Sequence, residues 1–107
     1  MRLKKQMTSL SKTIIKQGEK KYEWSQTDES ISVRLPIKNV LLKNIDIFIS
    51  DLLLKINAQS IKYFAAIDFL HEVEYKNSKN RIQLLDQRLE VMVMKKVQGA
   101  HWNTLEK

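Results

Sequence analysis

Few side chains in this sequence could carry out covalent or metal chemistry. The chain has no cysteine and only two histidines, His71 and His101, and neither has a second histidine at helical or strand spacing. A zinc site needs three or four converging ligands, so the pattern predicts no metal site. Glu72 and Glu74 could form a carboxylate pair, but no nucleophile or second acid/base group of matched role stands beside them. We therefore expect a protein that is not an enzyme and that uses no cofactor and no small-molecule substrate.

A mixed face near the C-terminal end is the better candidate for a function, namely binding. In the segment 88–96, apolar Leu89, Val91 and Val93 alternate with Arg88, Glu90, Met92 and Met94. A strand places these two sets on opposite sides of a sheet. Methionine adapts to partners at low strain, so a face of charges and methionines suits binding better than plain exposure. The predicted partner-binding residues are Arg88, Glu90, Met92, Met94 and Lys95. The alternative is an ordinary outer face that the N-terminal tail partly covers.

The segments that must position this face have the period of β-strands. Short runs rich in Ile and Val alternate with polar residues, and Asp- and Asn-type turns separate them. We predict about seven strands, at 22–26, 29–36, 44–50, 53–57, 60–70, 81–85 and 88–96. With no helical pattern between them, they indicate an all-β protein, a seven-stranded antiparallel β-sandwich. The stretch 41–54 also permits a buried helix, because its apolar residues are dense.

The first 21 residues have a different composition. They hold seven Lys or Arg against one acid, a net charge of +6, whereas the rest of the chain has a net charge of +1. Leu3, Met7, Leu10 and Ile14 form the apolar stripe of a short amphipathic helix. Two heptads are too short to be stable alone in water. This basic helix or tail therefore has three interpretations: a tail that orders only against a surface, a helix that docks on a partner through its stripe, or a mitochondrial targeting peptide.

Length and charge exclude several classes of protein. A chain of 107 residues forms one domain with one core. No apolar stretch approaches the ~18–20 residues that a membrane span needs. The net charge of +7 is concentrated in the leader, and the aromatic residues are not interleaved with a basic stripe. Stacking platforms for nucleic acids require that interleaving, so we expect no nucleic-acid partner.

Several motifs stand in an order and spacing that are typical of one family. They are Tyr-Glu-Trp-Ser-Gln-Thr-Asp at 22–28, Ile-Lys-Asn-Val at 37–40, Phe-Leu-His-Glu-Val at 69–73, Arg-Leu-Glu-Val-Met-Val-Met-Lys-Lys at 88–96 and the closing Trp102. Together they resemble the CS domain of CHORD-containing proteins and Sgt-type co-chaperones. Leu-Pro-Ile-Lys at 35–38, Leu-Lys-Ile-Asn at 54–57 and Trp-Asn-Thr-Leu at 102–105 look equally like the CS domain of a dynein axonemal assembly factor. The likeness divides the chain into a basic amphipathic extension, 1–21, and a CS domain, 22–107.

The resemblance implies a function as well as a fold. CS domains are seven-stranded antiparallel β-sandwiches, and most members are non-enzymatic co-chaperones or adaptors. Several bind heat-shock protein 90 and help to mature client complexes, including axonemal dyneins. In the Sgt type a charged pair on the last long strand takes part, and it corresponds by position to Arg88 and Glu90. The aromatic residues that the same contact uses on the first two strands are replaced here by Ser25 and Pro36.

The resemblance therefore predicts an adaptor for heat-shock protein 90 or for its dynein-assembly clients, with a cytoplasmic or ciliary location. The alternative is a permanent structural subunit of a large ciliary or axonemal assembly that uses the CS domain as a docking scaffold. Both alternatives make the partner a protein.

Overall fold

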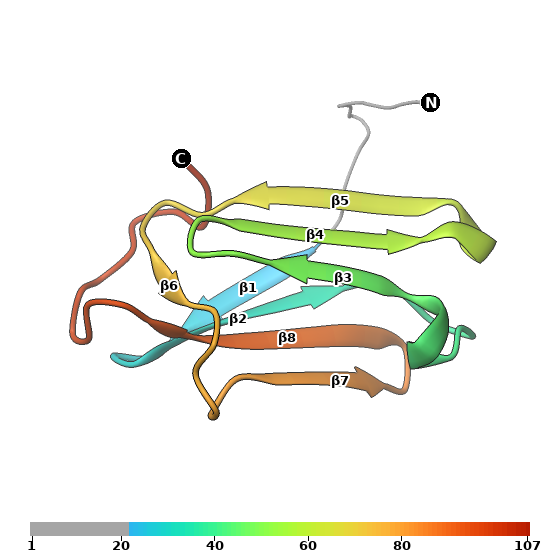
Figure 1. The fold of residues 1–107 in the computed structure, drawn as a ribbon, viewed down its shortest axis with the longest axis horizontal. Helices are drawn as coiled ribbons and strands as arrows, with labels where there is room; N and C mark the ends of the chain where they lie inside the picture. The colour runs from blue at the N-terminus through green and yellow to red at the C-terminus, as the bar shows by residue number, and fades with distance from the viewer. Residues whose placement is uncertain (1–21) are drawn as a thin grey trace.

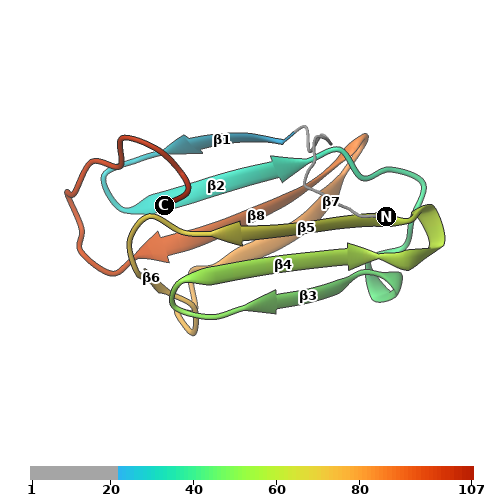
Figure 2. The ribbon, with the colours of Figure 1, turned by 90° about the horizontal axis from the view of Figure 1, so that it is seen from above.

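The computed structural model describes residues 22–107, which form two antiparallel β-sheets packed face to face (Figure 1). Figure 2 shows the two layers from above, with β1, β2 and β8 in one layer and β3, β4 and β5 in the other. In the five-stranded sheet β2 pairs with one edge of β8, and β6 and β7 both pair with β8 as well. The strands are β1 (Glu23–Gln26), β2 (Ser30–Leu35), β3 (Asp46–Ile49), β4 (Leu53–Ala58), β5 (Tyr63–Asp68), β6 (Val73–Glu74), β7 (Arg81–Leu85) and β8 (Arg88–Lys95), with the 3-10 helices η2 (Leu42–Asn44) and η3 (Gln59–Ile61).

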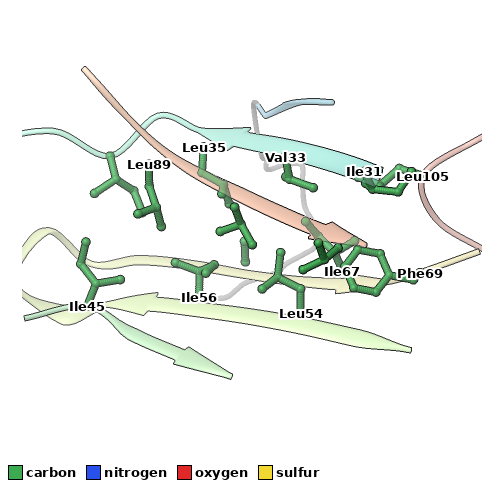
Figure 3. Close-up of a cluster of buried hydrophobic side chains, with 14 of the residues drawn as sticks. Ile31, Val33, Leu35, Ile45, Leu54, Ile56, Ile67, Phe69, Leu89 and Leu105 are labelled. Carbon is green, nitrogen blue, oxygen red and sulfur yellow. The ribbon is translucent and has the colours of Figure 1, made fainter. Parts of the chain in front are cut away.

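The core lies between the sheets and follows from the two-residue period of the strands. Every second side chain of β2 and β8 points inward, where it meets the inward side chains of β4 and β5 (Figure 3). The fully buried members include Ile31, Leu35, Leu54, Ile56, Ile67, Phe69 and Leu89. Burying an aliphatic side chain of this size contributes ~1.5–3 kcal/mol, so the alternating pattern itself holds the two layers together.

The predicted all-β sandwich is confirmed, with one more strand than the sequence indicated. Each of the predicted segments contains a strand. The additional strand is β6, and its two residues are too few to produce a recognisable period. The segment 60–70 begins its strand later than predicted, because η3 extends to Ile61 and the next residue, Lys62, has a left-handed backbone (φ 54). In the segment 41–54 the strand interpretation is confirmed, apart from one turn of 3-10 helix in η2.

The C-terminal segment closes one end of the sandwich. Trp102 is 1% exposed, and its ring meets Phe69 at 6.0 Å and His71 at 5.5 Å between centroids, both edge to face. Leu105 is buried as well, and Glu106 forms an antiparallel bridge with Phe69. The chain end is therefore an integral part of the core. The predicted amphipathic helix with Leu3, Met7, Leu10 and Ile14 lies outside the described residues.

Candidate functional site

Four of the five predicted binding residues, all except Lys95, lie on the outer face of the five-stranded sheet. The strand registers place one side chain of every two on this face, which we call the polar face. Its members are Glu23 and Ser25 of β1, Ser30, Ser32 and Arg34 of β2, Glu74 of β6, Arg81, Gln83 and Leu85 of β7, and Arg88, Glu90, Met92 and Met94 of β8. The three serines are short, so β1 and β2 present an outer surface with few protruding side chains.

Arg34 is the centre of a row of polar side chains that crosses four strands of the polar face, and three of these strands contribute a charge. Its guanidinium lies 3.7 Å from a carboxylate oxygen of Glu23 and 3.6 Å from one of Glu90. It also donates a 3.1 Å hydrogen bond to the hydroxyl of Ser25. Gln83 of β7 donates to Glu90 at 3.5 Å. The side chains of Arg34 and Glu90 are only 18% and 22% exposed, so this network is partly shielded from water and fixes the positions of its charges.

Arg88, Glu90 and Met92 occupy the outer face, as their alternation predicted. Arg88 is exposed, whereas Glu90 and Met92 are half-buried. Arg88 lies opposite Leu85 of β7, and Met92 lies between Ser32 and Arg81. The two arginines of β7 and β8 thus flank the half-buried centre of the face. The binding role of these residues remains a prediction, but their location together on one accessible surface is a property of the structure.

Met94 is on the same face but is not accessible, which corrects the expectation of an exposed contact. It is 4% exposed. Its backbone N–H donates to the side-chain oxygen of Asn80 at 2.9 Å, and the Asn80 amide donates to the carbonyl of Glu74 at 2.8 Å. β6 pairs with this end of β8, and Glu74 lies directly opposite Met94 on the same face.

Lys95 was predicted to contact a partner, and the structure contradicts this exposure. It is 1% exposed and points to the inner side of β8, as Val93 does. Its ammonium donates to the side-chain oxygen of Gln26 at 2.9 Å and to the carbonyl of Ala100 at 2.6 Å. Gln26 also bonds the backbone N–H and the carbonyl of Trp102, at 3.0 Å and 2.8 Å. Lys95 therefore ties the C-terminal segment to β1 and β8, and its function is structural.

Sequence reasoning did not single out Arg34 or Gln26, although each is central to a network. Both lie in strands, and the alternation of apolar and polar residues indicates which side of the sheet each side chain is on. Their partners Glu90 and Lys95 are more than fifty residues away in sequence, so the contacts arise only when β1, β2 and β8 pair. Ser25, one of the two departures from the Sgt-type contact, lies on the polar face beside Arg34, and Pro36 follows β2 and is exposed.

A shallow pocket of about 390 Å³ lies beside β6. Asp51, Glu72 and Glu74 contribute carboxylates to its lining, and Lys76 and Lys96 contribute amines. Within residues 22–107 no three His, Cys, Asp or Glu side chains are grouped so that they could hold a metal ion. Over the same residues, no helix has the length and apolar character needed to cross a membrane.

Solved structures with the same fold come from proteins of different kinds. The CS and b5R domains of human Ncb5or in the NAD+ form match with a TM-score of 0.66 and 21% identity, over 81% of this chain and 25% of that one. The nuclear movement protein of E. cuniculi matches with a TM-score of 0.64 and 23% identity, over 80% of this chain and 98% of that one. The first CS domain of USP19 matches with a TM-score of 0.51 and 18% identity, over 80% and 95%.

At these identities the structural matches establish the fold alone, and the chain spans about a quarter of the Ncb5or structure. No curated protein matches the sequence. The sequence model of the CS domain does match, over residues 20–95, which is most of the chain and nearly all of the sandwich. With the alternating strands, the two-layer topology and this match in agreement, the chain belongs to the CS domain family, whose fold is a protein-interaction module of the heat-shock protein 90 co-chaperone type.

Proposed function

We propose that this chain is an adaptor that binds heat-shock protein 90 or one of its client complexes through the polar face around Arg88 and Glu90. The observation that carries the proposal is a difference between the arginines of this face. Arg34 is neutralised by Glu23 and Glu90, whereas Arg88 and Arg81 are exposed, and neither forms an ion pair within residues 22–107. Unpaired arginines beside a fixed, half-buried centre can pair with carboxylates of an acidic partner, and arginine is enriched among residues that dominate binding energy.

The partner contact is expected to be reversible. A face made of charges, serines and a half-buried methionine resembles a transient interface more than the apolar surface of a permanent one. Ser25 and Pro36 stand where the Sgt type has aromatic contacts, so the affinity here would depend mainly on the charges. We further propose that the clients include dynein complexes under assembly and that the protein acts in the cytoplasm or the cilium.

Calorimetric titration of the full chain with heat-shock protein 90 tests the proposal. Reversing both unpaired charges, with Arg81→Glu and Arg88→Glu, should weaken binding at least tenfold, since it replaces attraction by repulsion. Lys55→Glu on the opposite sheet is the matched control, because Lys55 is equally an exposed cation without an ion pair in the described part of the chain, and it should leave binding unchanged. Equal binding by the double variant and the unmodified protein would reject the polar face.

The alternative of a permanent structural subunit is favoured by a different observation. Of the eight large hydrophobic residues that are exposed within 22–107, five lie in or beside the three-stranded sheet, and they are Leu41, Leu42, Phe48, Ile61 and Phe64. Permanent interfaces are more apolar than transient ones. A tagged chain expressed in ciliated cells distinguishes the two functions: a subunit would exchange from its assembly over hours, whereas an adaptor would exchange within minutes.

A further inference from the structure

The three-stranded sheet is open at β3. Ser50 donates to the carbonyl of Leu53 at 2.8 Å, which makes these two residues a hydrogen-bonded pair at the end of the β3–β4 hairpin. Hydrogen-bonded pairs alternate along an antiparallel ladder, so Phe48 bonds with Lys55, and the N–H and C=O groups of Ile47 and Ile49 point away from β4. No described residue pairs with this edge of β3.

The opposite sheet extends past this open edge. Ile82 and Leu84 of β7 face inward, because they pair with the buried Val91 and Leu89 of β8. An inward residue of a closed sandwich is normally buried, yet Ile82 is 38% exposed and Leu84 is only half-buried. In Figure 1 β7 lies beyond β3, and no strand of the three-stranded sheet covers it. The inner side of β7 is therefore an apolar shelf beside a free strand edge.

The isoleucines of β3 show the same lack of cover. Ile47 and Ile49 point inward and pack against the core, but both are only half-buried. A strand added beside β3 would lie over the inner side of β7, and its inward side chains would cover Ile47, Ile49 and Ile82. A strand edge with unpaired N–H and C=O groups is a template for pairing with another chain.

The charged residues at the two ends of this edge indicate which side chains an added strand would have. The segment from Asp46 to Asp51 reads Asp-Ile-Phe-Ile-Ser-Asp, with a carboxylate at each end and no base between them. Both aspartates are exposed, and neither forms an ion pair in the part of the chain that the structure describes. Asp51 also lines the pocket beside β6, where three carboxylates, those of Asp51, Glu72 and Glu74, outnumber the two amines of Lys76 and Lys96. An apolar strand with a basic residue at each end is complementary to this edge.

We propose that β3 is a second interaction site, which takes an extended segment of a partner protein as a fourth strand of the small sheet. The segment has apolar side chains at alternate positions, which cover Ile82 and Leu84, and a Lys or Arg at each end, which pair with Asp46 and Asp51. Its backbone bonds with Ile47 and Ile49. This site is separate from the polar face, which lies on the other side of the five-stranded sheet, and it does not depend on the chaperone assignment.

Selection from a phage-displayed library of random octapeptides on the full chain tests the proposal. The selected peptides should share alternating apolar residues flanked by Lys or Arg. In the complex with a synthetic copy of such a peptide, hydrogen exchange of the Ile47 and Ile49 amides should slow at least tenfold. Ile82→Lys should weaken binding of the peptide at least tenfold. Ile61→Lys changes a similarly exposed isoleucine outside the shelf and should leave the affinity unchanged.

Every other outcome overturns the proposal. These are a selection without enrichment, a peptide that binds Ile82→Lys as well as the unmodified chain, and protection that maps to the polar face. Two other occupants are distinguishable. Self-association that Ile82→Lys abolishes, measured by light scattering, would identify a second copy. Faster exchange at Ile47 and Ile49 in the full-length variant Ile14→Asp/Ile15→Asp would identify the leader, which carries its own apolar pair between Lys12 and Lys16.

Discussion

On the outer face of the five-stranded sheet, the central charges are paired within the molecule, Met94 is buried and Met92 is half-buried. On the outer face of the three-stranded sheet, Phe48 and Phe64 are 54% and 57% exposed. Lys55 stands between their strands without an ion pair among the described residues. The two sheets share one core, so the difference does not come from the packing that holds them together. It lies in how many outward side chains of each sheet are paired or buried within the molecule.

This difference suggests two kinds of contact. The polar face holds its charges in fixed positions at little cost in exposed apolar area, which suits a partner that binds and leaves. The three-stranded sheet leaves aromatic surface and a free strand edge uncovered, and a contact there would bury apolar area and complete a hydrogen-bond ladder. One small domain can therefore offer a charged surface and an apolar edge to two different partners at once.

The largest expected effect is at Lys95, the last residue of β8, and its neighbour Lys96 provides the comparison. Lys95→Ala removes the buried amine that bonds Gln26 and the carbonyl of Ala100, and it leaves both acceptors without that donor. We expect a loss of about 3 kcal/mol in the free energy of unfolding. Lys96→Ala changes an exposed residue and should cost less than about 0.5 kcal/mol. Urea denaturation measures both, and equal losses would contradict the structural function of Lys95.

A second pair of variants compares the outer faces directly. Met94→Ala truncates a side chain that is 4% exposed and should destabilise the protein by about 2–3 kcal/mol. Phe48→Ala removes a larger side chain from the outer face of the other sheet, but it is 54% exposed and should cost less than about 1 kcal/mol. Thermal unfolding followed by circular dichroism is sufficient. If Phe48 proved the more costly of the two, its side chain would have a structural function and the contrast between the faces would fail.

The charge row of the polar face should have a smaller effect. Arg34→Ala breaks the contacts with Glu23 and Glu90, whose separations of 3.7 Å and 3.6 Å are those of partly solvated pairs. We expect a loss of about 1 kcal/mol at low ionic strength, which should shrink in 1 M salt because the Debye length falls to about 3 Å. Unfolding measured at the two salt concentrations gives the comparison. A loss independent of salt would mean that Arg34 acts through packing and its hydrogen bond to Ser25, and not through its ion pairs.

The smallest effect concerns Tyr63, whose buried hydroxyl has no hydrogen-bond partner among the described residues. Desolvation by burial raises the pKa of Tyr63, because the phenolate is disfavoured away from water. The pKa of Tyr63 in the folded protein thus exceeds the value of about 10 in the unfolded chain. Above pH ~10 the hydroxyl loses its proton more readily in the unfolded chain, so the free energy of unfolding is at its full value below pH ~10 and falls as the pH rises above it. Tyr63→Phe should be neutral or stabilising by up to about 1 kcal/mol at neutral pH, since no partner is lost.

Unfolding followed from pH 8 to pH 11 checks that sign. The unmodified chain should lose stability above pH ~10, and Tyr63→Phe should lose less over the same range. Tyr75 is exposed and supplies the control for the substitution itself, because Tyr75→Phe should change the free energy of unfolding at neutral pH by less than about 0.5 kcal/mol. A destabilising Tyr63→Phe at neutral pH would show that the hydroxyl does have a partner.

Much of the fold could be predicted from residue types alone. The alternation in β2, β4 and β8 identified both the strands and their buried sides, because the inward positions other than Lys95 are apolar and most of the outward ones are polar. The same alternation assigns Lys95 to the inner side with Val93. Lysine is rarely buried, however, so its residue type predicts an exposed side chain at this position. β6 was missed because a two-residue strand is defined by its pairing with β8 and not by any period of its own.

The sequence by itself determined the family, the strand positions and the polar character of the face around Arg88. It could do so because a strand's side-chain period and turn residues are local properties. Only the tertiary structure decided which residues of that face are accessible, that Glu90 pairs with Arg34, and that the small sheet stops one strand short of covering Ile82. Those properties depend on how distant strands pair and how wide the two sheets are, and no local pattern carries that information.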